Sequence, residues 1–506
     1  MKSRCVVALM VLLVAPAFAL DGAPGMHDPS TVIQADGKFY VYATGNGLPA
    51  FVSDDGWTWR RAGSVMQAVP GGRPGPEVIA RGGNNSWAPD VIRVGDRYFL
   101  YYAAPGTQPK AAIGLLIGKS LDPSSPDYKW EDGGPIVWSD GVEDSNAIDP
   151  GVLRDPTNGT LWLTYGSYFG YIRLVELDPK TGKRLHPERT PVNVAINSEA
   201  SVMIFHEGWY YLLVTHGSCC AGGNSSYNIR MGRAKKVTGP FIDNMGVDMM
   251  QGGGKLFAGS SGRHIGPGHF GLLDLGDGVQ KFSCHYESDL DRGGASVLDI
   301  RPLLWRDGWP VAGDNFTAGT YEIQSARTGT ALEMAVQGVP VGGGRGRGGR
   351  GGGAVPGGRG ESGSPPTVTP IAAQDAAQVS GNWPSGPVDV RMAPYMVQAQ
   401  QKWTITPVAD SGGYPGSPFF KITIAGTDRA LAATPESELV VVPAFTGAAE
   451  QLWRIDQLTD GTYRLMPKAI PNAKQPLALS AVGSSSPTLA KFRPDSDRQR
   501  WLIVTP

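Results

Sequence analysis

Three carboxylates stand at the start of three similar segments of this chain: Asp28 in "HDPS", Asp149 in "IDPG" and Glu199 in "SEAS". Two carboxyl groups that face each other across a sugar-sized gap can hydrolyse a glycosidic bond, because one activates water and the other protonates the leaving oxygen. A third acid nearby can keep the proton donor protonated by like-charge repulsion. Asp-Pro pairs also mark ordinary turns, so this chemistry requires elements that bring the three segments together.

A repeated layout predicts such elements. Five segments share a polar or ionisable residue, a short apolar run, a turn and an aromatic-rich strand, and they begin at His27, Trp87, Ile148, Glu199 and Gly268. Their turns contain Asp-Gly, Gly-Asp, Asn-Gly, Glu-Gly and Gly-Asp-Gly, which is typical of β-hairpins. Each repeat is therefore expected to begin as a hairpin, and the spacing leaves room for one four-stranded propeller blade per repeat.

The phase of the repeats predicts where the ionisable residues lie. We take Asp28, Asp90, Asp149, Glu199 and His269 as equivalent positions. The first strand of every propeller blade lines the central channel, so three carboxylates and a histidine are expected to converge there. For Asp90 we favour a structural hydrogen-bonding role over that of a fourth channel acid.

The motifs "HDPS", "WAPD", "IDPG", "SEAS", "CCAGGNSSYNIRMGR" and "GPGHFG", in that order, resemble glycoside hydrolase family 43. The double cysteine followed by Ser-Tyr and Gly-Arg is similar to the endo-1,5-α-L-arabinanases of that family. The resemblance spans roughly residues 21 to 312 and implies a five-bladed propeller enzyme acting on arabinan or arabinoxylan. Fructan-cleaving propellers carry Asn, Arg and Cys where this chain has His27, Ile148 and Ala200, so that family is excluded.

The resemblance also implies roles for the acids. Asp28 corresponds to the general base that activates water for inverting attack, Glu199 to the general acid, and Asp149 to the acid that orients Glu199 and modulates its pKa. An exo-acting α-L-arabinofuranosidase or β-xylosidase on the same fold is the alternative. A non-catalytic carbohydrate-binding propeller is a third reading, against which the three intact acids argue.

Further residues are predicted to bind ligands. Trp87, Asn146 and Ser167 are expected substrate contacts, although a buried structural role suits Trp87 about equally well. The resemblance places His269 next to a single channel cation, calcium or another ion, held with waters. Since hard cations prefer oxygen ligands, a lone histidine leaves the identity of the ion open.

The C-terminal third has a different texture. Three Gln-x-Trp triplets end at Trp403, Trp453 and Trp501, and they resemble the ricin-type β-trefoil. The chain is therefore expected to be all-β, with a five-bladed β-propeller at 20–313 followed by a β-trefoil at 314–506. A Gly/Arg-rich stretch at about 338–366 is expected to be a disordered insertion.

Only one trefoil lobe keeps the acid that sugar-binding lobes usually carry. Glu333 holds that position in the first lobe, whereas Ala432 and Ala478 replace it in the other two. Glu333 therefore marks a weak carbohydrate-binding site, unless the module is a structural appendage.

The N-terminus reads as a signal peptide at 1–19, with an apolar run and an Ala-Phe-Ala cleavage site. This predicts a secreted or periplasmic protein. The mature chain keeps Cys219, Cys220 and Cys284, and the adjacent pair is either a vicinal disulfide or two buried thiols.

Composition limits the partners. The chain has 506 residues with 46 acidic and 45 basic side chains, which argues against a dominant nucleic-acid or anionic-membrane surface. The Arg-Gly insertion invites an RNA-binding interpretation, but the export signal and the balanced charge oppose it. We expect a monomer that binds polysaccharide and neither nucleic acid nor membrane.

Overall fold

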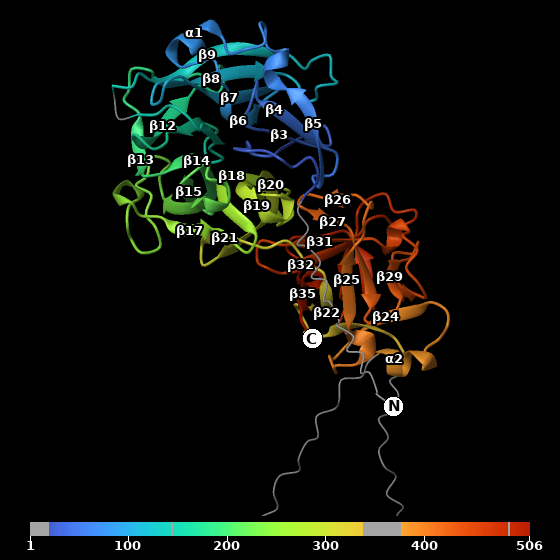
Figure 1. Ribbon diagram of the computed structural model, residues 1–506. Coiled ribbons are helices and arrows are strands. Elements are labelled where there is room, and N and C mark those ends of the chain that lie inside the picture. Colours follow the sequence, from blue (N-terminus) through green and yellow to red (C-terminus); the bar gives the residue numbers. More distant parts are fainter. Residues whose placement is uncertain (1–19, 143–144, 337–375, 484–485) are drawn as a thin grey trace, which may run out of the picture. The chain divides into compact units, whose positions relative to one another are not determined.

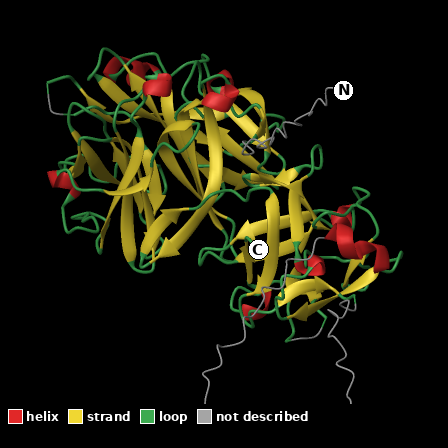
Figure 2. Cartoon of the chain, turned by 60° about the horizontal axis from the view of Figure 1, so that its bottom comes forward, coloured by secondary structure: helices red, strands yellow, loops and turns green. Residues whose placement is uncertain are grey.

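The computed structural model describes residues 20–142, 145–336, 376–483 and 486–506, and these residues form mainly β-strands (Figures 1 and 2). The α-helices of this part are α1 (Pro76–Arg81) and α2 (Ala376–Val379). Neither has the length or the apolar character that a membrane crossing demands. The predicted signal peptide and the predicted Gly/Arg-rich insertion lie outside the described residues.

The chain divides into two compact units, with the change at Thr317. Two later loops, Ala409–Phe419 and Asp456–Thr462, group with the first unit. The domain limits given above, 20–313 and 314–506, stay a prediction.

The first unit is a five-bladed β-propeller, as expected. Each blade is an antiparallel sheet whose strands follow in sequence order, and β1 (Asp21–Gly22) adds a parallel edge to blade one. The strands of blades one to five are β2 (Ile33–Ala35), β3 (Lys38–Tyr42), β4 (Pro49–Ser53), β5 (Thr58–Ser64); β6 (Trp87–Val94), β7 (Arg97–Pro105), β8 (Ala111–Gly118), β9 (Trp130–Ser139); β10 (Gly151–Arg154), β11 (Leu161–Tyr165), β12 (Tyr171–Leu177), β13 (Val192–Ile196); β14 (Glu199–His206), β15 (Trp209–His216), β16 (Asn228–Ala234), β17 (Lys255–Ala258); β18 (His264–Asp274), β19 (Gln280–Asp289), β20 (Ala295–Arg306) and β21 (Trp309–Ala312).

The predicted hairpins are confirmed. In blade one, Ala35 pairs with Lys38 across an Asp36-Gly37 turn, and both turn residues have positive φ, 50° and 78°. Blade four repeats this geometry at Glu207-Gly208, with φ of 45° and 77°. Two residues with positive φ give the turn a twist that matches the flanking strands, which is why these dipeptides were informative.

Apolar clusters between neighbouring blades form the core. Blades one and two, for example, share a cluster in which Tyr42 meets Trp130 edge-on at a centroid distance of 6.5 Å. Similar clusters join the other neighbouring pairs, including blades five and one. The N-terminal segment also links the last and first blades, because Gly25 bridges to Val297 of β20 while β1 pairs with β5. The ring is therefore closed by packing and by backbone hydrogen bonds.

The second unit contains a closed ring of six strands. β22, β25, β28, β31, β32 and β35 pair in turn, and β35 pairs back with β22. Three hairpins, β23–β24, β29–β30 and β33–β34, accompany the ring. This is the arrangement expected of a β-trefoil; the ricin-type relationship stays a prediction. The strands are β22 (Gly319–Ser325), β23 (Ala331–Met334), β24 (Val388–Ala393), β25 (Trp403–Pro407), β28 (Phe420–Ile424), β29 (Ala430–Ala433), β30 (Leu439–Val442), β31 (Trp453–Gln457), β32 (Tyr463–Pro467), β33 (Ala478–Ser480), β34 (Thr488–Ala490) and β35 (Trp501–Val504), and the short hairpin β26 (Gly413–Tyr414) and β27 (Ser417–Pro418) belongs to the loop grouped with the first unit.

The three Gln-x-Trp triplets make equivalent hydrogen bonds to the backbone. The fully buried Trp403, Trp453 and Trp501 each donate their indole N–H to a backbone carbonyl, of Leu332, Leu431 and Leu479 respectively, at 2.9–3.0 Å. The triplet glutamines accept a backbone N–H from the preceding loop: Gln401 from Met396, Gln451 from Thr446 and Gln499 from Arg493. The repeat in sequence is therefore a repeat in hydrogen bonding.

Candidate active site

The start of each blade carries one non-glycine residue in the left-handed conformation. These residues are Asp28, Ala88, Asp149, Ala200 and His269, with φ of 49°, 41°, 56°, 48° and 57°. In blades two, four and five the strand register shifts at the same place, as in a β-bulge. Backbone conformation therefore identifies the equivalent positions of the five repeats.

This corrects the phase assigned from the sequence. The residue equivalent to Asp28 is Ala88 in blade two and Ala200 in blade four, so Asp90 and Glu199 are out of phase with the other markers. The prediction was wrong because it followed the acidic residues, whereas the β-bulge determines which residues are equivalent. Asp90 accepts the N–H groups of Thr31 and Val152 at 3.1 and 2.9 Å, contacts of the structural kind that we favoured.

Hydrogen bonds connect these bulges around the ring. In four of the five blades, the N–H of the left-handed residue donates to a side chain of the preceding blade. The pairs are Ala88 to Thr44, Ala200 to Asp149, His269 to Thr215 and Asp28 to His285. Four of the blades therefore help to fix the start of the next blade, which is where the candidate catalytic residues lie.

Asp28 is held as an ionised carboxylate. Its Oδ2 accepts from Thr44 Oγ1 at 2.7 Å and lies 2.9 Å from His27 Nδ1, while Oδ1 lies 3.1 Å from His269 Nδ1. Burial acts to raise the pKa of Asp28, but the hydrogen bonds with His269 and His27 outweigh it and hold the pKa well below its ordinary value. An ionised carboxylate can accept a proton.

Glu199 has the opposite tendency. Its carboxyl group is buried and accepts hydrogen bonds from two neutral hydroxyl groups, Ser167 Oγ at 2.7 Å and Tyr227 Oη. Burial raises the pKa of Glu199, against the effect of these hydroxyl groups, and the charge of Asp28 adds to the increase. A carboxyl group with a raised pKa keeps its proton and can donate it.

Asp149 lies close enough to Glu199 to interact with it electrostatically. It is buried, and its Oδ2 accepts the N–H of Ala200 at 3.3 Å. Burial and then the charge of Glu199 raise the pKa of Asp149. The structure thus brings Asp28, Asp149 and Glu199 into one interacting group, while their assignment as base, modulator and acid stays a prediction.

The predicted substrate contacts occupy different environments. Ser167 is buried and bonds Glu199, so it supports the acid directly. Asn146 is also buried; its Nδ2 donates to the Tyr168 carbonyl at 3.4 Å, while its Oδ1 accepts nothing from the described residues. Trp87 is half-buried and packs against Ile148. Contact with a sugar remains a prediction for all three.

The surroundings of His269 do not form a calcium cage. His269 is buried, with Nδ1 facing Asp28, and burial acts to lower its pKa, but the hydrogen bond with Asp28 raises it. Among the described residues, the groups of three or more side chains that could hold a metal ion do not include His269. Because calcium takes six to eight oxygen ligands, these side chains do not by themselves fit the predicted cation.

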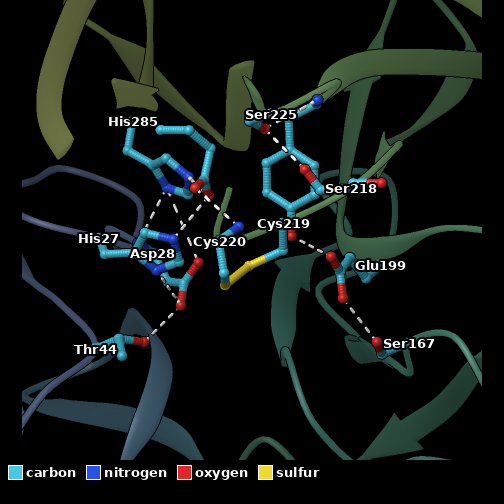
Figure 3. Close-up of a disulfide and its surroundings, with 12 residues drawn as sticks. His27, Asp28, Thr44, Ser167, Glu199, Ser218, Cys219, Cys220, Ser225 and His285 are labelled. Carbon is cyan, nitrogen blue, oxygen red and sulfur yellow. Dashed lines mark hydrogen bonds and ion pairs between the residues drawn. A yellow bond between two sulfur atoms is a disulfide. The ribbon is translucent and has the colours of Figure 1, made fainter. Parts of the chain in front are cut away.

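A disulfide links Cys219 and Cys220, which settles the alternative left open by the sequence. Cys220 is exposed and Cys219 half-buried, so the pair is not a set of buried thiols. In the view of Figure 3 it lies between Asp28 with His27 on one side and Glu199 with Ser167 on the other. Its sulfur atoms are within 4.8 Å of ligand atoms of His27 and Glu287.

The sequence interpretation missed several residues of this site. Thr44 and His27 contact Asp28, and Tyr227 contacts Glu199. Glu287 forms hydrogen bonds with His285 and His27. Tyr227 stood in the quoted double-cysteine motif and His27 in "HDPS", so a signal existed for these two. For Thr44 and Glu287 nothing in the local sequence showed that they contact Asp28 and His27.

The chain is similar to known glycoside hydrolases. The family model of glycosyl hydrolases family 43 matches residues 23–310. An extracellular exo-α-(1→5)-L-arabinofuranosidase of Cellvibrio japonicus is 31% identical over 302 residues, which cover 56% of this chain and 85% of that protein. An extracellular endo-α-(1→5)-L-arabinanase of Bacillus subtilis is 31% identical over 293 residues, covering 56% of this chain and 87% of its own length.

A solved structure shows the same likeness. The exo-1,5-α-L-arabinanase from a bovine ruminal metagenomic library matches with a TM-score of 0.51 and 35% identity. The match covers 58% of this chain and 99% of that one. The residues that the family model matches, 23–310, fall on the propeller.

Proposed function

Because the chain belongs to glycosyl hydrolases family 43, we propose that this glycoside hydrolase cleaves α-1,5-linked L-arabinan internally and inverts the anomeric carbon. The contrast between the half-buried Asp28 and the buried Glu199 carries the proposal: hydrogen bonds with histidines keep the pKa of Asp28 low, whereas burial raises the pKa of Glu199. Divergent pKa values are what separate base from acid in a carboxylate pair. Three similar proteins are named as α-1,5-L-arabinofuranosidase or arabinanases, which supports arabinan as substrate.

In the proposed reaction, Asp28 removes a proton from water as the water oxygen bonds to the anomeric carbon. Glu199 gives its proton to the glycosidic oxygen as the bond from that carbon to the leaving sugar breaks. After one turnover Asp28 is protonated and Glu199 ionised, and exchange with solvent restores both. His27 and Thr44 direct the Asp28 carboxylate, and Ser167 and Tyr227 direct that of Glu199.

Asp149 acts on Glu199 rather than on the sugar. Two neighbouring carboxyl groups do not readily ionise together, so each favours the protonated form of the other. Its bond to the Ala200 N–H also fixes the backbone directly after Glu199. Asp149 therefore serves to keep the acid protonated and oriented.

Hydrolysis of linear arabinan tests the proposal. A ladder of oligosaccharides at early times is expected for internal cleavage, and proton NMR should show the inverted anomer before mutarotation. The matched variant Glu199→Gln keeps the shape of the side chain and removes the transferable proton. Retained configuration, or full activity of this variant, would reject the mechanism.

The second candidate is exo-acting. The Cellvibrio japonicus and ruminal proteins are both named as exo-enzymes, so the same assay must decide between endo and exo action. Release of arabinose alone from the start would identify an α-L-arabinofuranosidase. Hydrolysis of an aryl β-xyloside in preference to an arabinofuranoside would instead identify a β-xylosidase.

A single channel cation remains part of the proposal, although the described side chains supply no cage for it. Water ligands would have to complete its coordination, and no catalytic step above depends on it. If His269 contacts such an ion, a chelator should lower the melting temperature of the wild type and leave His269→Ala unaffected. An equal response of the two proteins to the chelator would place the ion elsewhere.

We also propose secretion of a monomer to the periplasm or the medium. The sequence of residues 1–19 has the composition of a signal peptide, and two similar proteins are named extracellular. Cell fractionation and N-terminal sequencing of the mature protein test export, and light scattering tests the oligomeric state. Arabinoxylan as a further substrate is tested by the same product analysis.

A further inference from the structure

Glu287 lies behind Asp28 and accepts three hydrogen bonds, although it has no role in the reaction derived above. It belongs to β19, and its side chain is only 3% exposed. Its Oε1 lies 2.8 Å from His27 Nε2 and 3.3 Å from His285 Nε2, and its Oε2 accepts the N–H of Cys220 at 2.9 Å. Glu287 thus connects two histidines to the disulfide loop.

The hydrogen bonds determine the protonation of both histidines. The N–H of Asp28 donates to His285 Nδ1 at 3.0 Å, so this nitrogen carries a lone pair and Nε2 carries the proton that faces Glu287. His27 differs, because both its nitrogens face carboxylates, Asp28 on one side and Glu287 on the other. Two such hydrogen bonds require a proton on each nitrogen, so His27 is an imidazolium.

The cluster is consistent with this charge pattern. Burial acts to lower the pKa of His27, but hydrogen bonds with Asp28 and Glu287 raise it to about 10. Burial acts to raise the pKa of Glu287, but the two histidines lower it to about 2. Neutral His285 stacks on His27 with ring centroids 4.4 Å apart, which avoids two facing cations.

We propose that Glu287 is a positioning residue for the general base: it fixes His27 and His285, which together hold the Asp28 side chain and backbone, and the Cys219–Cys220 disulfide loop fixes Glu287 in turn. This rests on the proposed function of Asp28. The same logic operates where a buried carboxylate holds an imidazole in the tautomer that catalysis needs. The ionisable groups that act on Asp28 are His27, His269, His285, Asp149, Glu199 and Tyr227.

The variant Glu287→Gln tests the first connection. It preserves shape but places an amide where both histidines donate, so kcat on arabinan should fall about 100-fold with little change in KM, as expected for a misplaced catalytic group. A ring ¹⁵N spectrum at pH 8 should show a charged His27 in the wild type and a neutral one in the variant. His27→Gln should lower kcat similarly, and the double variant should lose little more.

The matched control is Asp155→Asn. Asp155, in blade three, is also a buried carboxylate and accepts a hydrogen bond from Tyr210 Oη at 2.7 Å. Its replacement therefore measures what the loss of a buried carboxylate costs outside the candidate site. It should lower stability and leave kcat unchanged. If kcat of Glu287→Gln falls no more than that of Asp155→Asn, or if His27 stays charged in Glu287→Gln, the positioning role is overturned.

Reduction tests the second connection without a substitution. When a dithiol such as dithiothreitol acts, the Cys219–Cys220 bond breaks, each sulfur takes up one electron and one proton, and the dithiol closes to a cyclic disulfide. Cys284 is buried and unpaired, so it adds no second disulfide within the described residues. The kcat of the wild type should fall roughly 10-fold, and that of Glu287→Gln by much less, because partners in one network are not additive.

An equal loss in both proteins would show that the disulfide acts independently of Glu287. If the wild type does not cleave arabinan, the proposed function fails, but the ¹⁵N spectra of His27 still test whether Glu287 sets its charge. The two failures are therefore distinguishable.

Discussion

Glu199 in the propeller and Glu333 in the second unit are both buried glutamates, yet their surroundings differ. Glu199 receives hydrogen bonds from two neutral hydroxyl groups and lies near other carboxylates. Glu333 is paired with the Arg391 guanidinium and accepts from Gln401 Nε2 at 2.8 Å. Burial and the charge of Asp28 favour the protonated form of Glu199, whereas Glu333 forms an ion pair. Burial alone therefore does not identify a catalytic acid; the charge of its partners does.

The same contrast extends to the two units as wholes. The propeller gathers acids and histidines at the bulges that open its blades, and several of them have strongly shifted pKa values. The second unit repeats a tryptophan and a glutamine in each lobe, both bonded to backbone. In the first unit the repeated positions carry the candidate catalytic residues. In the second unit they carry residues that stabilise the core.

The largest effect is expected from the acid and the base. Glu199→Gln and Asp28→Asn should each lower the initial rate on arabinan by roughly 10³-fold, within the range that general acid or base catalysis contributes. A reducing-sugar assay measures the rate, and circular dichroism checks the fold. Glu333→Gln is the matched control in the second unit and should keep the wild-type rate on short oligosaccharides. If Glu199→Gln lowers the rate less than tenfold, the proposed difference in role between Glu199 and Glu333 is wrong.

The next effect is on stability. Trp403 is fully buried, so Trp403→Ala should lower the free energy of unfolding of the second unit by about 3–5 kcal/mol. The kcat on short arabino-oligosaccharides should not change. Trp130→Ala, a matched change in the propeller core, should instead destabilise the catalytic unit. Urea denaturation followed with activity measures both, and loss of kcat in Trp403→Ala would contradict independent cores.

Asp149→Asn should mainly change the pH dependence of activity. The acid works only while Glu199 is protonated, so activity falls as pH rises through the raised pKa of Glu199. Burial and the charge of Glu199 raise the pKa of Asp149 to about 8, so the two carboxyl groups titrate as a coupled pair whose mutual repulsion raises the second ionisation. Asp149→Asn removes this repulsion, and the alkaline limb of kcat/KM should move down by about one pH unit. The acid limb should stay at low pH, because hydrogen bonds with His269 and His27 keep the pKa of Asp28 low. An alkaline limb that stays in place would exclude the modulator role.

The smallest effect is expected for Glu333→Gln itself. Arg391 is 46% exposed on its side chain, so water can solvate it once its partner is gone. The free energy of unfolding of the second unit should fall by about 1 kcal/mol, the usual net value of a lost hydrogen bond. Affinity for polymeric arabinan, measured by pull-down, should not change if Glu333 is purely structural. A clear loss of affinity without a loss of stability would instead support the predicted sugar site.

The sequence predicted much of the fold because its signals are local. Asp36-Gly37 and Glu207-Gly208 impose hairpins through backbone conformation that any observer can infer from residue type. The Gln-x-Trp triplets likewise recur in phase with the lobes that they fasten. The predicted phase was wrong for Asp90 and Glu199, since the sequence does not show which residue of a β-bulge adopts positive φ.

The candidate site divides in the same way. By itself, the sequence determined that five hairpin repeats carry Asp28, Asp149, Glu199 and His269 near their starts, because residue type and spacing are properties of the chain. Only the tertiary structure decided that Glu287, far along the chain, would lie against His27, and that the Cys219–Cys220 loop would lie against Glu287. The physical reason is ring closure: blade five packs against blade one, and contacts across that junction have no counterpart in local sequence.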